Sequence, residues 1–383
     1  MRFIHTADWH LGRSLYNISL IEDQAYVLNQ LIDLAKDTQP ALLIIAGDIY
    51  DRAIPSTDAV QLLDDALSRL ILGIGIPVLL IAGNHDNPQR LQFGARLLEK
   101  LKLHVFGALS ERSFIQMYDE AGAVSFYALP YAEPSLIREY LQNDQITNHD
   151  SGLRAWINDL KAKPSFSSMT RSVLVGHAFV VGGEASESER PLSVGTAGTV
   201  SADCFDGFHY VALGHLHRPQ SLANEQIHYS GSLLKYSFSE ASHSKSVNLV
   251  EIDAAGQCKV ERIPLTAKRD VRYVEGTMAE IISGRVERGN PEDFVKVKLK
   301  DTGAILNAAG KLREVYPNFS GIDYPAPMSE PNNLISKTGR MDSDIAMLFA
   351  AFYQEVTGQH LTSAQAAVFS SVVDKVRLQE REA

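Results

Sequence analysis

The sequence predicts a layered α/β fold over roughly its first 260 residues. Short aliphatic segments, each suited to a buried strand, alternate there with longer segments whose apolar residues recur at helical spacing. Buried strands that alternate with amphipathic helices are typical of a sheet covered by helices on both faces. We therefore expect a sheet-and-helix body, followed by smaller elements.

Five aliphatic segments are the expected strands of this body. In chain order they are RFIHTADWH, PALLIIAGDIYD, PVLLIAGNHD, RSVLVGH and HYVALGHLH. Residues 23–36 carry apolar side chains at helical spacing between the first two segments, and residues 57–71 do so between the second and third. These two stretches are the helices that we expect to cover the sheet.

Composition limits the class of protein. The chain has 383 residues, of which 45% are hydrophobic and 21% charged, which is typical of a globular protein with two or three domains. Its aliphatic runs are too short to cross a membrane and no basic-then-apolar leader opens it, so we expect a cytoplasmic protein. Cys204 and Cys258 lie far apart and predict neither a disulfide scaffold nor a zinc–thiolate site. The net charge of −10 argues against a uniformly basic surface, but it leaves room for a local basic or metal-rich site.

The pattern changes near Lys268, which predicts further domains. The segment FVKVKLKD alternates strictly and places three lysines (Lys296, Lys298 and Lys300) on one face, which is either solvated or faces a ligand. Two apolar stripes near the C-terminus predict a helical pair that either packs on the body or docks on a partner. We expect a catalytic domain over 1–265, a small α+β capping domain over 266–325, a linker over 326–340 and C-terminal helices over 341–383.

Each of the five predicted strands ends in side chains that bind metals. Small residues, such as Gly47, Gly83 and Gly214, precede nearly all of them and permit close approach of the backbone to a ligand. Because strand ends gather along one edge of an open α/β sheet, we expect these side chains to meet. They are Asp8, His10, Asp48, Asn84, His177, His215 and His217, with His85 beside Asn84.

This set of side chains predicts a centre with two metal ions. Two carboxylates, one amide and four imidazoles suit manganese, iron or zinc better than calcium or magnesium. Seven ligands are too many for one small open site, but they suffice for two ions if Asp48 bridges them. Two ions about 3.5–4 Å apart are the recurring solution for hydrolysis of phosphate esters. Any one of these motifs alone is more often a turn or a buried histidine, whereas five together favour the metal centre.

In order and spacing, DWH, GDIYD, GNHD, GH and GHLH resemble the motifs of calcineurin-like metallophosphoesterases. The resemblance implies that one ion is held by Asp8, His10, Asp48 and His217, and the other by Asp48, Asn84, His177 and His215. It also implies that His85 meets the scissile phosphate and assists the leaving group. Asp51 is suited to orient His85 as a neighbouring carboxylate, although it equally suits the start of a helix.

Two longer segments, residues 177–220 and 229–240, are similar to the nuclease subunits of bacterial SbcCD complexes. That resemblance implies a four-layer metallophosphoesterase sandwich with a small α+β cap and a C-terminal helical pair that docks on an SbcC-type coiled-coil ATPase. The implied activity is an ATP-dependent exonuclease on double-stranded DNA ends and an endonuclease at hairpins and blocked ends, in DNA repair and recombination. The implied cofactors are two divalent ions, with Mn²⁺ expected, and the implied assembly is a homodimer within a heterotetramer. Because the chain has no GxxxxGK[ST] motif, ATP dependence would come from the partner.

Two other functions compete with this interpretation. A small-molecule phosphodiesterase or phosphatase could use the same ligands, but it would need neither a cap nor a docking tail. A metal-bound scaffold that positions a partner on DNA would have no use for His85 as a proton donor. We expect Trp9, Tyr16 and the loop over residues 182–195 to line the open site, although burial suits Trp9 equally well.

Overall fold

The computed structural model describes the chain except residues 112, 164–165, 167–169, 193–197, 224, 287–288, 302–304, 324–344 and 383. The predicted linker over 326–340 lies outside the described residues, and the predicted domain boundaries stay a prediction. By its contacts the chain divides into two compact units. The first comprises Met1–Val274, Glu287–Lys296 and Asn307–Gly321, and the second Glu275–Val286, Val297–Leu306 and Ile322–Ala383.

Two six-stranded sheets form the body of the first unit. In the first sheet β1, β4, β5 and β6 are parallel, and β15 runs antiparallel to both β1 and β16. Its order is β16 (Cys258–Pro264), β15 (Ser246–Ile252), β1 (Arg2–Thr6), β4 (Leu42–Ala46), β5 (Val78–Ile81) and β6 (Leu103–Phe106).

In the second sheet β8, β9, β12 and β14 are parallel, and the outer strands β7 and β13 are antiparallel to their neighbours. Its order is β13 (Gln220–Leu222), β14 (Ile227–Tyr229), β12 (Tyr210–Gly214), β9 (Arg171–His177), β8 (Gly122–Leu129) and β7 (Phe114–Asp119).

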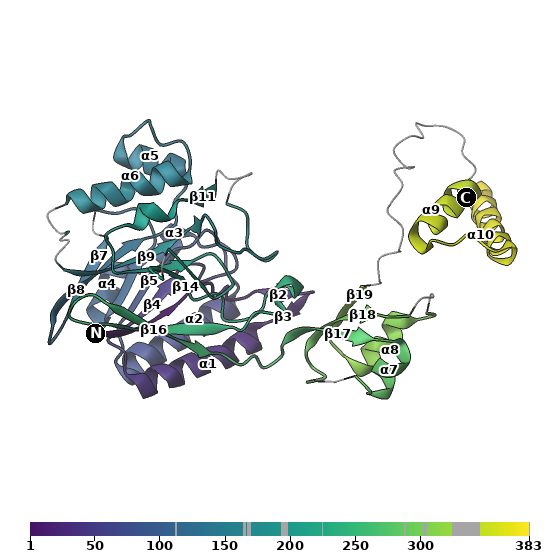
Figure 1. Ribbon diagram of the computed structural model, residues 1–383, viewed down its shortest axis with the longest axis horizontal. Coiled ribbons are helices and arrows are strands. Elements are labelled where there is room, and N and C mark those ends of the chain that lie inside the picture. The colour runs from purple at the N-terminus through teal and green to yellow at the C-terminus, as the bar shows by residue number, and fades with distance from the viewer. Residues whose placement is uncertain are drawn as a thin grey trace. The chain divides into compact units, whose positions relative to one another are not determined.

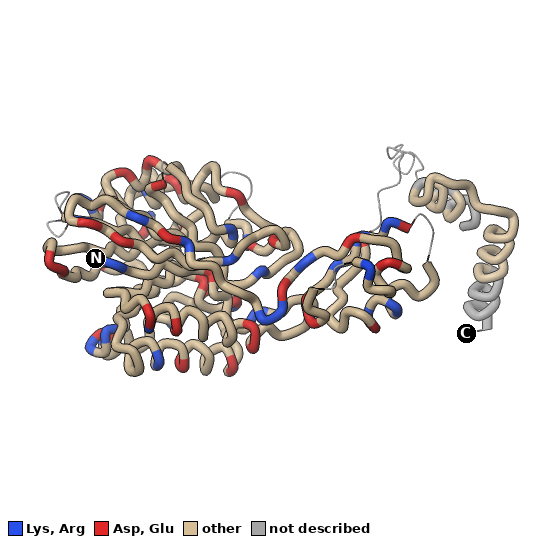
Figure 2. Tube along the Cα trace, turned by 60° about the horizontal axis from the view of Figure 1, so that its bottom comes forward, with Lys and Arg blue, Asp and Glu red and all other residues tan. Residues whose placement is uncertain are grey.

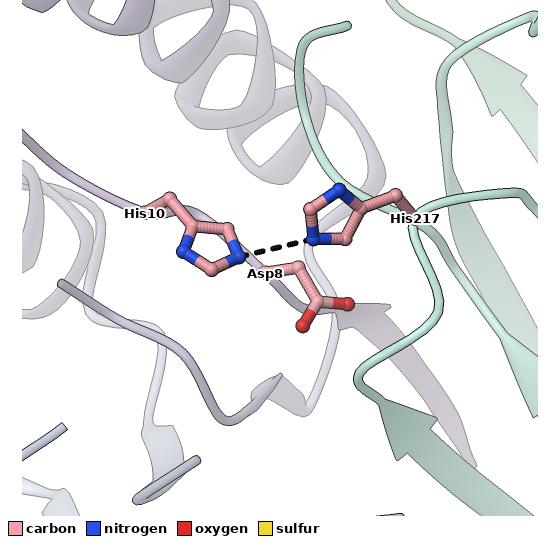
Figure 3. A group of neighbouring side chains, drawn as sticks. All are labelled: Asp8, His10 and His217. Carbon is pink, nitrogen blue, oxygen red and sulfur yellow. Dashed lines mark hydrogen bonds between the residues drawn. The ribbon is translucent and has the colours of Figure 1, made fainter. Parts of the chain in front are cut away.

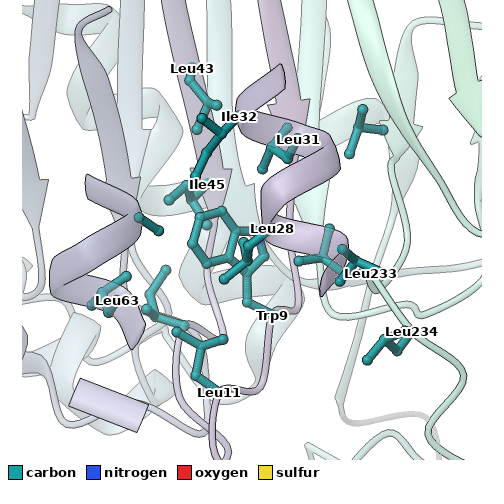
Figure 4. Close-up of a cluster of buried hydrophobic side chains, with 14 of the residues drawn as sticks. Trp9, Leu11, Leu28, Leu31, Ile32, Leu43, Ile45, Leu63, Leu233 and Leu234 are labelled. Carbon is teal, nitrogen blue, oxygen red and sulfur yellow. The ribbon is translucent and has the colours of Figure 1, made fainter. Parts of the chain in front are cut away.

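Side-chain alternation along the strands shows how the layers stack. In β4, Leu43 and Ile45 belong to a core shared with helices α1 (Ile21–Thr38) and α2 (Thr57–Ser68), which Figure 4 shows in close-up. Leu42 and Ile44, on the other face of β4, belong to a different core with Phe126 of β8. The two sheets therefore pack face to face.

The outer face of the second sheet is covered by two helices, α5 (Pro134–Leu141) and α6 (His149–Ala162) (Figure 1). Tyr127 and Leu129 of β8 share a third core with Ile137 of α5 and Trp156 of α6. The order of layers is thus helices, sheet, sheet, helices. The predicted four-layer α/β sandwich is confirmed.

The five predicted strands are divided between the two sheets. β1, β4 and β5 lie in the first, and β9 and β12 in the second. The single sheet covered on both faces that periodicity predicted is therefore wrong. An aliphatic run shows that both faces of a strand are buried, but it does not show whether a helix or a second sheet covers each face.

The remaining short elements connect these layers. The predicted second helix, residues 57–71, continues past α2 as a π-helical turn, η1 (Arg69–Ile74). The others are β2 (Ser14–Leu15), β3 (Ile18–Ser19), α3 (Pro88–Leu91), α4 (Ala95–Leu98), η2 (Glu99–Leu101), β10 (Phe179–Val180), β11 (Thr199–Val200), η4 (Ala202–Phe205) and η5 (Phe238–Glu240).

A three-stranded sheet and two helices follow in the predicted capping region. The sheet has the order β17 (Val271–Gly276), β18 (Phe294–Leu299) and β19 (Phe319–Asp323). A capping box begins α7 (Met278–Ser283): Glu280 N–H donates to Thr277 Oγ1 (3.3 Å), and Thr277 N–H donates to the Glu280 carboxylate (2.9 Å). The second helix is α8 (Ala308–Val315).

The predicted C-terminal helical pair is confirmed as α9 (Ile345–Thr357) and α10 (Ser363–Glu382). Gly358 ends α9 with a left-handed φ of 68° and donates its N–H to Gln354 (2.9 Å). The rings of Phe349 and Phe369 stack at 3.9 Å and join the two helices. No described helix combines the length and the apolarity that crossing a bilayer requires.

Candidate metal centre

The ends of five strands bring all seven predicted ligands into one cluster. Asp8 and His10 follow β1, Asp48 follows β4 and Asn84 follows β5, while His177 ends β9 and His215 and His217 follow β12. Asn84 is partly buried and the other six are buried. The cluster thus draws on both sheets.

The first group comprises Asp8, His10 and His217, whose ligand atoms lie within 4.8 Å of one another (Figure 3). Nε2 of His10 lies 3.1 Å from Nε2 of His217. It also lies 3.6 Å from Oδ2 of Asp48. These four residues are the set predicted for one ion.

The second group lies on the other side of Asp48. Asp8, Asp48 and His177 each offer a ligand atom within 4.8 Å of the others. Oδ1 of Asn84 lies 2.9 Å from Nε2 of His177 and 3.2 Å from Nδ1 of His215. The four residues predicted for the second ion are therefore also neighbours, and Asp48 contacts both groups.

The hydrogen bonds of His177 leave a position that a cation fits. Nδ1 of His177 donates to the carbonyl oxygen of Ala46 (3.0 Å), so the neutral ring presents a lone pair at Nε2. That lone pair faces the Asn84 carbonyl oxygen, which is also an acceptor. Two acceptors in contact repel each other unless a positive charge lies between them, so the residues fit a divalent metal ion.

Burial sets the protonation states of the cluster. Burial, together with the neighbouring carboxylate of Asp48, raises the pKa of Asp8 well above its usual value. Burial, together with neighbouring histidines, lowers the pKa of His10 and His215. These two imidazoles are therefore neutral ligands, and the two carboxylates need a compensating cation to be ionised together.

Four of the predicted ligands have a left-handed backbone: Asp8 (φ 53°), His10 (φ 45°), Asp48 (φ 49°) and His215 (φ 103°). Such conformations cost about 1–3 kcal/mol each for residues other than glycine. Hydrogen bonds between the loops hold them, since Asp8 N–H donates to Gly47 O (3.1 Å) and His10 N–H to Asp48 O (2.9 Å). Strain that gathers at one cluster is typical of a functional site.

Two glycines are required because the loops approach so closely. A Cβ on Gly83 would lie 2.1 Å from Oδ1 of Asp48, and one on Gly214 would lie 2.0 Å from the carbonyl oxygen of Ala46. The sequence prediction that these glycines permit close approach is confirmed.

His85 lies beside the ligands, but Asp51 holds it in a different way from the one predicted. Nδ1 of His85 donates to the main-chain carbonyl oxygen of Asp51 (2.8 Å) rather than to its carboxylate. The Asp51 carboxylate instead accepts a hydrogen bond from Arg13 (3.2 Å). Nε2 of His85 is buried and has no hydrogen-bond partner among the described residues, so its hydrogen-bonding capacity is unused.

Asp86 supports the loops around the cluster. Its carboxylate accepts hydrogen bonds from the N–H groups of Ile49 (3.0 Å), Tyr50 (2.9 Å) and Gly83 (2.9 Å). Burial and the neighbouring Asp48 raise the pKa of Asp86 to about 7, although these N–H groups oppose the rise. Asp86 thus ties the loop after β4 to the loop after β5.

Sequence reasoning missed the buried residues behind His217. Glu240 is fully buried and accepts hydrogen bonds from Ser188 and Lys245. Burial opposes its ionisation, but His217 and Lys245 hold the pKa of Glu240 well below its usual range. Glu240 lies in the recognised segment 229–240, but nothing in its spacing links it to His217.

Trp9 does not line the site. It is fully buried in the core between the first sheet and α1, as Figure 4 shows, and its Nε1 donates to Thr6 Oγ1 (3.0 Å). Tyr16 is half exposed at the turn between β2 and β3. Of the predicted loop over 182–195, Ser188, Glu189 and Arg190 line the opening described next.

An open cavity of about 480 Å³ leads to His85 and Asn84. Arg13, Arg52 and Arg190 all line it. Asp51, Asp86 and Glu189 line it too, and Arg13 and Arg52 both pair with Asp51, so the opening to the candidate centre carries both arginines and carboxylates.

The calcineurin-like phosphoesterase family model matches residues 1–219, which is more than half of the chain. The chain belongs to the calcineurin-like phosphoesterase family. A second model, SbcD_C, described as the type 5 capsule protein repressor C-terminal domain, matches residues 267–357. Together the matches confirm the resemblance of this phosphoesterase to SbcD-type nuclease subunits.

This calcineurin-like phosphoesterase is also similar to solved structures. The Thermus thermophilus protein TT1561 is 15% identical, with a TM-score of 0.37 over 68% of this chain and 98% of that one. A dimetal phosphatase from Danio rerio is 12% identical, with a TM-score of 0.40 over 70% of this chain and 99% of that one.

Members of the calcineurin-like phosphoesterase family are metal-dependent hydrolases that use two divalent ions. In this member, the two groups that meet at Asp48 are the candidate positions for those ions.

Proposed function

We propose that the protein is a two-metal DNA phosphodiesterase, the nuclease subunit of an SbcCD-type complex. One observation carries this proposal. His85 lines the opening next to the ligand cluster, and its buried Nε2 has no hydrogen-bond partner among the described residues. A phosphodiester needs both a proton donor for its leaving oxygen and positive charge for its phosphate.

Two divalent ions, with Mn²⁺ expected, would supply Lewis-acid activation of water and of the phosphate when bound. Asp8, His10, Asp48 and His217 would hold one of them. Asp48, Asn84, His177 and His215 would hold the other.

His85 acts as the general acid in this proposal. Its Nδ1–H donates to Asp51 O, which holds the ring, so the general acid would be the doubly protonated ring, whose Nε2–H passes its proton to the departing sugar oxygen. The backbone N–H of His85 donates to Oδ1 of Asp48 (2.8 Å), which fixes the position of His85 relative to the ligands. General acid catalysis of this kind contributes about 10²- to 10⁴-fold to the rate.

The arginines favour DNA over a small ester. Figure 2 shows basic and acidic residues interspersed along the chain, whose net charge is −10, so the arginines at the opening are not part of a generally basic surface. Arg52 and Arg190 are exposed at the opening. We assign them to neighbouring phosphates of a strand, as an exonuclease on duplex ends and an endonuclease at hairpins or blocked ends requires.

The C-terminal helices support the proposed ATPase partner. Four large apolar side chains on α9 and α10 are at least half exposed: Phe352 (54%), Val356 (50%), Val368 (66%) and Val372 (52%). Exposed apolar stripes on helices suit docking onto another helix. We propose that they bind the coiled coils of an SbcC-type ATPase, which would supply the ATP dependence in DNA repair and recombination.

A further apolar surface supports the proposed homodimer within a heterotetramer. Phe93 (86%), Leu97 (73%) and Leu101 (53%) are exposed at four-residue spacing near α3 and α4. A charged residue at Phe93 is therefore expected to shift the protein toward monomer in sedimentation velocity.

A small-molecule phosphodiesterase is the competing function, because the metal centre alone would serve it. The deciding experiment is hydrolysis of labelled blunt duplex DNA with Mn²⁺, by the wild type and by His85→Ala. It is run with the protein alone and again with the ATPase partner and ATP. His104→Ala, on β6 outside the cluster, is the control for replacing a histidine.

We expect the wild type and His104→Ala to cut DNA, and His85→Ala to lose cutting while it still binds Mn²⁺ by calorimetry. If the wild type cuts no DNA under either condition but turns over bis(p-nitrophenyl) phosphate, the small-molecule function replaces the nuclease.

A further inference from the structure

Tyr16 occupies the tip of the β2–β3 hairpin in a conformation that bulky residues rarely adopt. Ser14 pairs with Ser19 and Leu15 with Ile18, so Tyr16 and Asn17 are the two turn residues. Both have positive φ, 48° and 66°, as a type I′ turn requires. Asn suits such a position, whereas Tyr is an outlier there. An outlier of this kind points to a role for the side chain beyond the turn itself.

The ring of Tyr16 is half exposed although it lies next to an aromatic cluster. Its centroid is 5.6 Å from that of Phe238, with the planes at 60°, and 50% of the residue is accessible. Phe238 is buried, and its ring centroid lies 5.5 Å from that of Tyr273. The edge contact with Phe238 thus holds the Tyr16 ring in place while half of its surface stays open to a ligand.

A positive charge accompanies this aromatic cluster. Nζ of Lys296 lies 5.3 Å from the centroid of the Phe238 ring. Lys296 is the first of the alternating lysines in the segment FVKVKLKD. An aromatic ring next to a cation is the combination that binds unpaired nucleotides, because the ring stacks on a base and the cation attracts a phosphate.

The hairpin begins at the opening of the metal centre. Arg13 and Ser14 line the cavity that also contains His85. Arg13 donates hydrogen bonds to the Asp51 carboxylate (3.2 Å) and to the Ser188 carbonyl oxygen (3.2 Å), which anchors the base of the hairpin. Two residues of extended chain span about 7 Å, so the tip lies within reach of a nucleotide next to the scissile phosphate.

We propose that Tyr16 is a stacking site for an unpaired nucleobase of the substrate strand, an inference that rests on the proposed nuclease function. Inside a duplex both faces of each base are covered by neighbouring bases. Only a frayed end or a hairpin loop offers a free face, so the site selects these structures. The simpler alternative is that Tyr16 only covers Phe238.

The test places the fluorescent base 2-aminopurine, which stacking quenches, in the loop of a DNA hairpin. Binding is followed by anisotropy and quenching in EDTA, so that the DNA is not cut. Tyr16→Leu keeps an apolar cover over Phe238 but has no ring, and Tyr16→Trp enlarges the ring. Tyr118→Leu replaces an exposed tyrosine of β7 and is the matched control.

We expect quenching with the wild type, Tyr118→Leu and Tyr16→Trp, and none with Tyr16→Leu. Affinity for the hairpin should fall about 5- to 150-fold in Tyr16→Leu. The melting temperature of Tyr16→Leu should stay that of the wild type, which shows that the loss is not one of folding.

Three outcomes would overturn the proposal. If Tyr16→Leu binds and quenches like the wild type, the stacking site is wrong and the nuclease function stands. If Tyr16→Leu is unfolded and Tyr16→Trp does not quench, Tyr16 only covers Phe238. If the wild type neither binds nor cuts any DNA, the nuclease function fails and the stacking site fails with it.

Discussion

The carboxylate of Glu240 lies 3.3 Å from Nδ1 of His217, and Ser188 hydrogen-bonds to both side chains. His217 therefore carries its proton on Nδ1 and presents the lone pair of Nε2 to the metal centre. Glu240 also forms an ion pair with the buried ammonium of Lys245. The buried Glu240–Lys245 ion pair thus lies next to His217, one of the candidate ligands.

Glu240→Gln should weaken Mn²⁺ binding about 10- to 100-fold, because the neutral amide no longer fixes the tautomer and orientation of the His217 ring as the carboxylate does. Isothermal titration calorimetry with Mn²⁺ measures this directly, without any substrate. Glu251→Gln, which removes an exposed carboxylate paired with Arg2, is the control and should bind Mn²⁺ normally. Equal Mn²⁺ affinity in both variants would mean that Glu240 only neutralises Lys245.

Gly83→Ala should lower the free energy of unfolding by about 1–3 kcal/mol, because its Cβ would meet Oδ1 of Asp48. It should also weaken Mn²⁺ binding, since Asp48 must move. Gly73→Ala is the matched control, because its Cβ would meet nothing within 4 Å. Urea unfolding of both variants measures the difference, and equal stability would contradict the close approach of the two loops.

The effect of Mn²⁺ on stability should depend on pH. The pKa of Asp8 is raised and that of Asp86 is raised to about 7, so the metal-free folded protein keeps protons that the unfolded chain releases near pH 4. The stability that these two groups contribute is therefore complete at low pH and lost as pH rises through the folded pKa values. A bound cation favours the ionised carboxylates, so metal binding expels their protons.

We accordingly expect Mn²⁺ to raise the melting temperature more at pH 8 than at pH 6, measured by differential scanning fluorimetry. The lowered pKa of His10 and of His215 keeps these rings neutral at both pH values, so they release no protons. An equal rise at pH 6 and pH 8 would show that the carboxylates are already ionised without metal.

Replacing Arg52 and Arg190 together by Ala should weaken DNA binding in a salt-dependent way. Each phosphate contact contributes about 0.9 to the slope of log affinity against log salt, so the slope should fall by about 2. Arg138→Ala with Lys36→Ala removes two exposed charges elsewhere and is the control. A slope unchanged from that of the wild type would exclude these arginines from the DNA contacts.

Sequence predicts the functional residues best where they directly follow a buried strand. Asp8, Asp48, Asn84 and His177 follow or end buried strands, so the strand pattern alone predicts that they meet. Trp9 shows the limit of this logic. It stands between two ligands in the sequence, but both neighbours have a left-handed backbone, so strand alternation does not predict where its side chain points, and it points into the core.

Contacts between residues that are far apart in the sequence cannot be predicted in this way. Glu240 contacts His217 across 23 residues that include β13 and β14, and no spacing pattern links the two, so only the folded chain shows the contact. Asp51 was predicted to hold His85, but sequence cannot tell a main-chain carbonyl from a side-chain carboxylate. The division of the strands between two sheets likewise came from family resemblance and not from the periodicity.

The order in which the chain is synthesised gives the two-sheet arrangement a further consequence. Asp8, Asp48 and Asn84 leave the ribosome well before His215 and His217. In the same way, β1 cannot pair with β15 until residues 246–252 have been synthesised. A nascent chain shorter than this has neither the complete set of ligands nor the complete first sheet. The complete metal centre therefore forms only when this domain is finished, and no fragment released early in translation contains all of the ligands.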